Sequence, residues 1–185
     1  MADPPTAPAA APPTDADGFD DFYRGTSRRL LRYAYGLTGD LGDAQDVVQE
    51  VYIRAWQRWS RLVRYDSSEA WLRLVTTRLA TDRWRRFGAR RAAAGILGVG
   101  TPAVAPPPPP AKNTIMLMAA MRSLPIDQRR VVALHYLLDM PVAQVATEIG
   151  VPEGTVKSWL SRGRAALAQK LGSSPVPAAN GGTDV

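Results

Sequence analysis

The chain has 185 residues, and its 23 basic and 17 acidic side chains give a formal net charge of +6, so we expect one or two domains and a polyanionic partner, nucleic acid before an anionic membrane. It has no cysteine and a single histidine, His135, which excludes disulfides and thiolate zinc sites and argues against histidine-based metal or catalytic chemistry. No apolar run reaches the roughly 18 residues that span a bilayer, and the Ala/Pro-rich start lacks the basic and apolar regions of a secretory signal, so we expect a cytoplasmic protein with no membrane association.

Two helical units are predicted, separated by a proline-rich linker. Residues 1–17 and 172–185 hold few core-forming side chains and should be disordered tails. Between them, apolar residues recur at helical spacing over 18–91 and 113–171, whereas 92–112 is rich in Ala, Gly and Pro. The expected fold class is all-α: two small helical domains joined by a flexible Pro-rich linker, the second containing a helix-turn-helix.

The first unit should begin with helices over about 20–37 and 43–59, with Asp43 as the N-cap of the second. The stripe of this second helix that we expect to be buried contains Ala44, Val47, Val48, Val51, Tyr52, Ala55, Trp56 and Trp59. Its opposite face carries Asp46, Gln49, Glu50, Ile53 and Gln57. A face of acids and amides around one isoleucine is either simply solvated or a docking surface for a basic partner helix.

A third helix should run from about 70 to 87 and carry most of the positive charge of this unit. Ser67 or Ser68 can cap its start, and its apolar stripe includes Trp71, Leu74 and Val75. Seven arginines against one acid fall within 21 residues: Arg73, Arg78, Arg83, Arg85, Arg86, Arg90 and Arg91. Arginines interleaved with aromatic side chains suit contact with phosphates and stacking on bases, so a merely solvated basic face is the weaker interpretation.

The second unit should end in two helices joined by a tight turn. The first has apolar residues at helical spacing, namely Val142, Val145, Ala146 and Ile149. Gly150 can adopt the left-handed conformation that ends a helix, and Pro152 prevents its continuation. The second helix, from about Glu153, buries an apolar stripe and exposes small polar and basic side chains. This pattern is typical of a helix-turn-helix, whose second helix enters the major groove; the alternative is an ordinary helical hairpin with a solvated basic face.

Three stretches together resemble the extracytoplasmic-function (ECF) sigma factors of bacterial RNA polymerase. DAQDVVQEVYIRAW, at 43–56, is similar to the family's D-x-x-D-x-x-Q-E-x-F-x-x-x-W signature. AWLRLVTTRLATDRWRR, at 70–86, is similar to its W-L-x-x-I-A-x-N-x-x-x-D-x-x-R-R helix. LPIDQRRV at 124–131, followed by GTVKSWLSRGRAAL at 154–167, is similar to its C-terminal helix-turn-helix. The resemblance covers about 18–91 and 113–171.

The resemblance implies a non-enzymatic promoter-specificity subunit that binds core RNA polymerase and promoter DNA and uses no cofactor or metal. Asp46, Gln49, Glu50 and Ile53 match the family surface that binds the clamp helices of the β′ subunit. The family also implies contact with the β flap, an anti-sigma factor as a candidate partner, and location at the nucleoid within the holoenzyme.

The resemblance also implies two DNA-binding surfaces. The residues matching the elements that bind and melt the minus-ten region are Tyr65, Asp66, Ser67, Ser68, Arg78, Arg83, Arg85 and Arg86. The loop among them pockets a flipped base in the family, and extrusion costs a few kcal/mol. The residues matching the reader of the minus-thirty-five element are Thr155, Lys157, Ser158, Ser161 and Arg162.

The chain departs from the family pattern at several positions. Arg78 stands where the family often has Asn, the loop before Trp71 lacks a common glycine, and Trp159 replaces a frequent arginine. Trp159 either packs against the scaffold or covers a sugar-phosphate edge.

Three other functions remain as alternatives. A stand-alone helix-turn-helix regulator explains only 124–171. An enzyme acting on nucleic acid lacks a metal-ligand cluster, a phosphate-cradling Gly loop and paired acids. A basic membrane-binding helix is disfavoured because buried aromatics interrupt its arginines.

Overall fold

The computed structural model describes residues 15–93 and 112–172, and every regular element in these two ranges is helical. The predicted tails and linker therefore lie almost entirely outside the described residues. In chain order the helices are α1 (Asp15–Thr38), α2 (Leu41–Trp56), α3 (Trp59–Leu62), α4 (Ser68–Ala93), α5 (Lys112–Arg122), α6 (Ile126–Val132), the π-helical turn η1 (Ala133–Leu137), α7 (Val142–Ile149) and α8 (Glu153–Gly172). The all-α prediction is confirmed.

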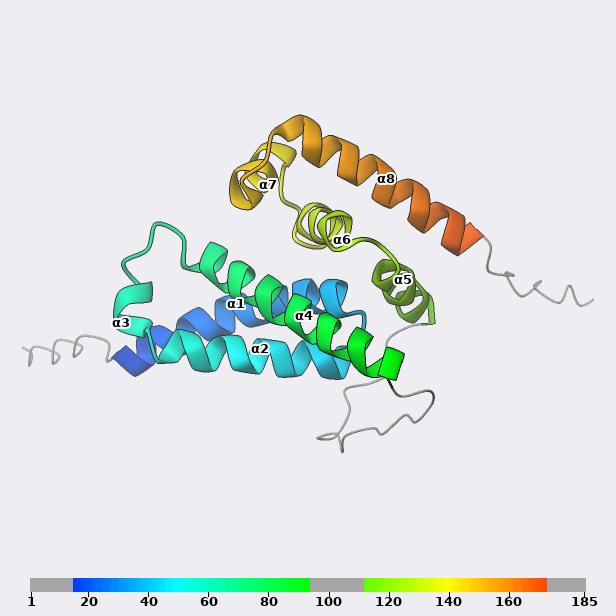
Figure 1. Cartoon of the computed structure of the whole chain (residues 1–185). Coiled ribbons are helices and arrows are strands. Elements are labelled where there is room, and N and C mark those ends of the chain that lie inside the picture. The colour runs from blue at the N-terminus through cyan, green and yellow to red at the C-terminus, as the bar shows by residue number, and fades with distance from the viewer. Residues whose placement is uncertain (1–14, 94–111, 173–185) are drawn as a thin grey trace, which may run out of the picture.

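Helices α1, α2 and α4 pack pairwise into a three-helix bundle, with the short α3 at one end (Figure 1). Their shared core is aliphatic, with Leu30, Ala34, Ala44, Val47, Val51, Ala55, Leu62 and Leu72 among its buried members. A chain of two hydrogen bonds extends into this core. The Thr26 hydroxyl donates to the Phe22 carbonyl at 2.6 Å, so the Tyr52 hydroxyl, 2.7 Å away, donates its proton to Thr26.

The starts of two helices show how local chemistry sets their boundaries. The N-cap of α2 is Asp40, whose carboxylate accepts a hydrogen bond from the Asp43 amide at 2.9 Å. The prediction of Asp43 as the cap was therefore wrong by three residues: Gly39, at φ +68°, ends α1 and lets α2 begin earlier. Before α4, the Ser67 hydroxyl accepts from the Ala70 amide at 3.1 Å, which confirms the predicted serine cap.

Two apolar side chains predicted to be buried are exposed instead. Trp56 is 50% exposed because α2 ends there, which leaves its ring at the rim of the bundle. Leu74 on α4 is also exposed. Periodicity alone could not place either, because the edge of an apolar stripe depends on which neighbouring helices cover it.

The second unit consists of α5, α6, η1, α7 and α8. As predicted, α7 ends at Gly150, which has φ +79°, and α8 follows after a short turn. Val156, Leu160 and Gly163 of α8 are buried. Gly163 is required for close packing, because an added Cβ would lie 2.8 Å from Cγ2 of Val132 on the neighbouring α6.

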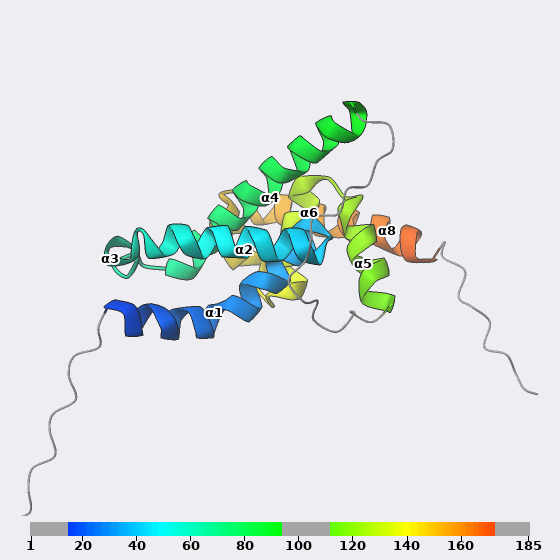
Figure 2. The same ribbon diagram turned by 90° about the horizontal axis from the view of Figure 1, so that it is seen from below.

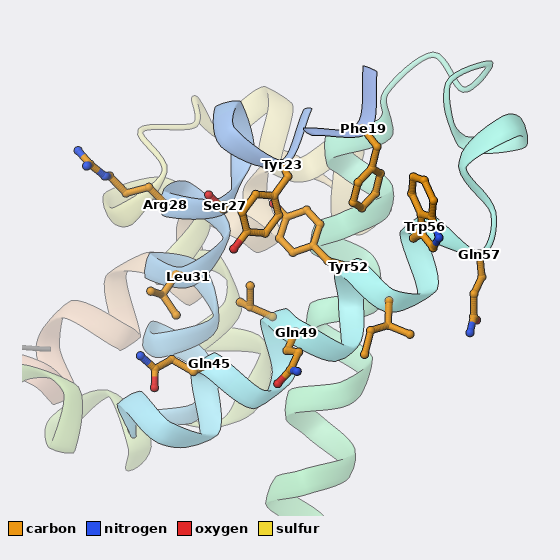
Figure 3. Close-up of a pocket in the computed structure, with 12 residues that line it drawn as sticks. Phe19, Tyr23, Ser27, Arg28, Leu31, Gln45, Gln49, Tyr52, Trp56 and Gln57 are labelled. Carbon is orange, nitrogen blue, oxygen red and sulfur yellow. The ribbon is translucent and has the colours of Figure 1, made fainter. Parts of the chain in front are cut away.

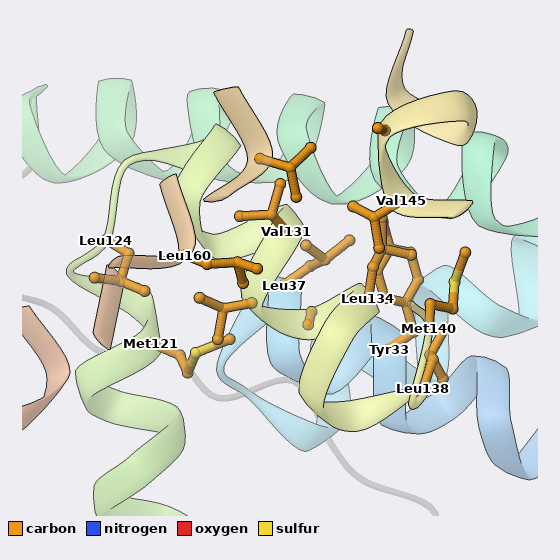
Figure 4. Close-up of a cluster of buried hydrophobic side chains, with 14 of the residues drawn as sticks. Tyr33, Leu37, Met121, Leu124, Val131, Leu134, Leu138, Met140, Val145 and Leu160 are labelled. Carbon is orange, nitrogen blue, oxygen red and sulfur yellow. The ribbon is translucent and has the colours of Figure 1, made fainter. Parts of the chain in front are cut away.

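The two units pack directly against each other, a feature that the sequence analysis did not predict. Tyr33 and Leu37 of α1 lie inside the hydrophobic cluster of the second unit (Figure 4). Gly36 allows the close approach, because an added Cβ would lie 2.5 Å from Cδ1 of Leu137. Nη1 of Arg129 on α6 also donates to the Leu37 carbonyl at 2.7 Å. Viewed from below, the second unit lies across the far side of the α1–α2–α4 bundle (Figure 2).

Candidate protein-binding and nucleic-acid-binding surfaces

The outer face of α2 presents the four residues expected to bind polymerase. Asp46 and Gln49 are exposed, Glu50 is half-buried, and Ile53 is 45% exposed although it is an aliphatic side chain. Glu50 accepts a hydrogen bond from Nε of Arg54 at 2.9 Å. The face is therefore open, polar along most of its length, and apolar at Ile53.

An apolar groove of about 870 Å³ between α1 and α2 adjoins this face (Figure 3). Gln49 and Ile53 belong to both the face and the groove. The groove also contains four aromatic residues in edge-on contact: the rings of Phe19 and Trp56 lie 5.0 Å apart and those of Tyr23 and Tyr52 lie 4.7 Å apart. This groove is not predicted by the pattern of any single helix. The signal in the sequence was one pair of aromatic residues at i, i+4 spacing on each helix: Phe19 and Tyr23 on α1, and Tyr52 and Trp56 on α2.

Arg83, one of the residues matched to the minus-ten elements, contacts the α2 face. Its Nη2 donates to Oδ2 of Asp46 at 2.7 Å, and its Nε lies 3.8 Å from Oδ1 of Asp43. Burial and the neighbouring Asp40 raise the pKa of Asp43, and Arg83 partly opposes that rise. Arg83 therefore neutralises acids on α2 in this arrangement.

The loop before α4 is open at its outer positions. Tyr65, Asp66 and Ser67 are exposed, whereas Ser68 is half-buried and donates from its hydroxyl to the Leu62 carbonyl at 2.8 Å. The two serine hydroxyls thus shape the loop, one by capping α4 and the other by bonding to the end of α3.

The arginines of α4 do not form one solvated row. Arg78 is exposed, but Arg73 is buried and ion-paired with Glu148 of α7. The side chains of Arg85 and Arg86 lie outside the described residues.

The N-terminal half of α8 carries the five residues expected to read DNA. Lys157, Ser161 and Arg162 are exposed, and Thr155 and Ser158 are half-buried. Lys157 lies 3.5 Å from Glu153, an exposed pair one helical turn apart. Trp159 is partly buried against the core of the second unit. The structure thus favours scaffold packing, the first of the two interpretations of this tryptophan.

Two structural features are absent from residues 15–93 and 112–172. None of the helices there is both long and apolar enough to cross a membrane. The same ranges contain no group of three or more His, Asp or Glu side chains placed to hold a metal ion.

Comparison with known protein families identifies two matching segments. Residues 22–91 match the model described as Sigma-70 region 2, and residues 114–167 match Sigma-70, region 4. These are the helical bundle and the unit that contains the helix-turn-helix.

Relatives of similar sequence indicate which kind of sigma factor the chain is. The chain is 36% identical over 136 residues to the ECF RNA polymerase sigma factor SigL of Mycobacterium tuberculosis, covering 71% of this chain and 76% of that protein. It is 33% identical over 159 residues to SigM of the same species, covering 85% and 79%. The chain belongs to the ECF sigma factors, the transcription initiation factors that direct RNA polymerase to promoters.

Solved structures agree with this fold. The sigma factor RpoE of Bartonella quintana, in complex with the anti-sigma factor NepR, aligns with a TM-score of 0.62 at 23% identity, over 84% of this chain and 99% of that chain. SigJ of Mycobacterium tuberculosis aligns with a TM-score of 0.53 at 27% identity, over 80% of this chain and 53% of that chain.

Proposed function

We propose that three separate surfaces divide the work of this sigma factor: the α2 face binds core polymerase, the loop before α4 binds the minus-ten strand, and the exposed side of α8 reads the minus-thirty-five element. The observation that carries the proposal is that these surfaces lie on different helices and differ in chemistry. The first is acidic and apolar, the second is a short polar loop with one exposed tyrosine, and the third is basic.

The α2 face suits the clamp helices of the β′ subunit. Exposed acid and amide groups at Asp46, Gln49 and Glu50 can pair with basic side chains of a partner helix. Ile53 and the groove beside it offer an apolar anchor, and such anchors usually dominate binding energy in protein interfaces. We therefore assign the groove to the same interface.

We assign the unpaired base to the loop residues Tyr65, Asp66 and Ser67, which are all exposed. An exposed tyrosine can stack on a base, which contributes about 1–3 kcal/mol and offsets the cost of extrusion. Arg78 is exposed on the helix that follows, where it can bind a backbone phosphate.

The α8 surface supplies the duplex contacts. Lys157 and Arg162 are long cations in the N-terminal half of the helix, the part of a helix-turn-helix that enters the major groove. Contact of such a side chain with guanine contributes roughly 1–3 kcal/mol of discrimination.

The remaining assignments follow from the family. We propose that the chain acts as a binding subunit without catalytic activity of its own, that it also contacts the β flap, and that an anti-sigma factor can regulate it. A protein whose partners are polymerase and promoter DNA works in the cytoplasm, at the nucleoid. A relative of this fold was solved in complex with the anti-sigma factor NepR.

Polymerase association and transcription test the docking assignment. We expect the chain to co-elute with core polymerase and to support run-off transcription from a cognate promoter. Gln49→Ala together with Glu50→Ala should weaken co-elution without changing the melting temperature, because both side chains lie on the surface. Asp127→Ala, on exposed α6 surface, is the control. Normal polymerase affinity in the double variant would show that the α2 face is merely solvated, and duplex binding without any polymerase association would favour a stand-alone regulator.

A further inference from the structure

One ion pair joins the two helical units in the part of the chain that the structure describes. Nε of Arg73 on α4 donates to both carboxylate oxygens of Glu148 on α7, at 2.8 and 3.0 Å, and Nη2 donates to Oε2 at 2.7 Å. Nη1 donates to Glu69 at 3.2 Å. The two side chains are only 8% and 11% exposed. A carboxylate from each unit therefore holds the guanidinium of Arg73.

Stability alone is a poor explanation for this pair. Much of the contact between the units is apolar, and replacing a buried ion pair by apolar side chains is often neutral or stabilising, whereas removing one partner leaves an uncompensated charge. Burial by itself lowers the pKa of Arg73, but the hydrogen bonds and negative charge of Glu148 more than offset that effect, so the pKa is raised. Arg73 is thus a permanent cation whose burial depends on Glu148.

The pair lies at the proposed minus-ten site. A groove of about 380 Å³ beside it is lined from the first unit by Ser67, Ser68, Glu69 and Arg73, and from the second unit by Leu138, Asp139, Met140 and Gln144. The second unit therefore forms one wall of the groove next to the loop before α4. In this arrangement the second unit adds the acid Asp139 to a groove that also contains Arg29, while the carboxylate of Glu148 is bound by Arg73.

A carboxylate and a phosphate are alternative ligands for the same guanidinium. Both accept two parallel hydrogen bonds from the planar fork of arginine, and arginine is common where either is bound. Glu148 engages Arg73 through Nε and Nη2, the edge that a backbone phosphate would use.

We propose that Glu148 occupies a phosphate-binding position on Arg73, and that the pair holds the two units closed until the promoter strand or polymerase separates them. Arg73 is then a further contact of the minus-ten strand, available only in the open arrangement. The strand contact rests on the proposed role of the loop before α4, whereas the closing role of the pair does not.

The opening of the units can be measured on the full chain. Because the chain has no native cysteine, Ser60→Cys and Ala168→Cys give two exposed labelling sites, one in each unit, for energy transfer. We expect Glu148→Arg to separate the labels, and the charge exchange Arg73→Glu with Glu148→Arg to bring them back together. Asp127→Arg, an equal change of charge on exposed surface of the same unit, should leave them close. Labels that stay close in Glu148→Arg would overturn the proposal, as would a charge exchange that fails to restore closure in a chain with native helix content.

Binding of a labelled single-stranded oligonucleotide of mixed sequence, about 12 nucleotides long, tests the phosphate contact. Glu148→Ala should bind it more tightly than Asp127→Ala, with a salt slope steeper by about 0.7, the value for one additional phosphate on a single strand. Arg73→Ala combined with Glu148→Ala should open the units equally but lose the additional slope. If that double variant keeps the steeper slope, Arg73 is not the phosphate ligand and the proposal fails. Polymerase co-elution of the unaltered chain is measured separately, so a failure of the proposed function would be recognised independently.

Discussion

Arg129 is a buried cation that no carboxylate of the described residues neutralises. It is 1% exposed, and its guanidinium donates to the carbonyls of Leu37, Arg122 and Leu124 at 2.6–2.9 Å. Its Nε is buried without a hydrogen-bond partner among those residues. Burial, followed by the charge of Arg122, lowers the pKa of Arg129 to about 10. Arg129 acts through its geometry, because its planar guanidinium hydrogen-bonds to carbonyl groups at the ends of both α1 and α5.

Arg129→Lys should therefore destabilise the protein even though it keeps the charge. An ammonium group cannot reach three carbonyls in different directions, and each buried acceptor left unpaired costs about 1–3 kcal/mol. We expect a loss of about 3 kcal/mol in urea unfolding. Arg32→Lys, on exposed α1 surface, is the matched control and should change stability by less than about 0.5 kcal/mol. Equal stability of the two variants would show that the three contacts contribute nothing.

Tyr52 should make stability depend on pH in the alkaline range. Burial raises the pKa of its hydroxyl from about 10 to about 12, although the hydrogen bond with Thr26 partly opposes this. Because the unfolded chain releases the proton first, the stabilising contribution is complete below pH 10 and is lost as pH rises toward 12.

The comparison with Tyr52→Phe isolates this group. The stability of the wild type relative to the variant should fall by up to about 1.4 kcal/mol per pH unit in that window. Denaturant unfolding at pH 8 to 11 measures the difference, which also cancels the opposite trend from Arg129. A difference that is constant with pH would show that the hydroxyl titrates normally.

At the scale of single helices, two of the three glycines of α8 have opposite roles. Gly163 faces α6, where an added Cβ would lie 2.8 Å from Val132, whereas a Cβ at Gly154 would meet no atom within 4 Å. Gly163→Ala should destabilise the chain by about 1–3 kcal/mol through overpacking. Gly154→Ala should stabilise it by about 0.4–1 kcal/mol, because alanine restricts the unfolded chain. Urea unfolding of both variants checks the signs, and a stabilising Gly163→Ala would mean that α6 and α8 are loosely packed.

The helices themselves could be predicted from the sequence because their signals are local. The stripe on α8 and the left-handed Gly150 follow from spacing and backbone preference, and both are confirmed. The exposure of Trp56 and the burial of Arg73 could not be predicted in this way. Each depends on which helix from elsewhere in the chain lies opposite, and a single sequence does not contain that information.

The same reasoning applies to the candidate sites. The α2 face and the basic start of α8 are one-helix features, so their residues were found together. For Arg83 the resemblance implies a role at the minus-ten region, and its ion pair with Asp46 depends on the packing of α4 against α2, which the sequence does not show. The aromatic groove needs α1 and α2 together, so it became visible only in the folded chain.

For the whole molecule, the interface makes the second unit depend on the first. Tyr33, Leu37 and Ala80 contribute to a cluster otherwise built from residues of the second unit. A fragment beginning at residue 112 should therefore melt below the full chain, by about 4–8 °C for each kcal/mol of lost packing. Adding a fragment that ends at residue 93 should restore part of that loss. Calorimetry of the isolated fragment and of the mixture measures both melting temperatures. An unchanged melting temperature for the isolated fragment would show that the contact contributes no stability.

The residues Lys157, Ser161 and Arg162 are outside the hydrophobic contact between the units and are exposed while the units are packed together. On the proposed assignment of α8 to the upstream promoter half, that half would be bound before the downstream strand becomes accessible to α4. We expect recruitment to follow a fixed order, in which the duplex is engaged first and strand separation comes second.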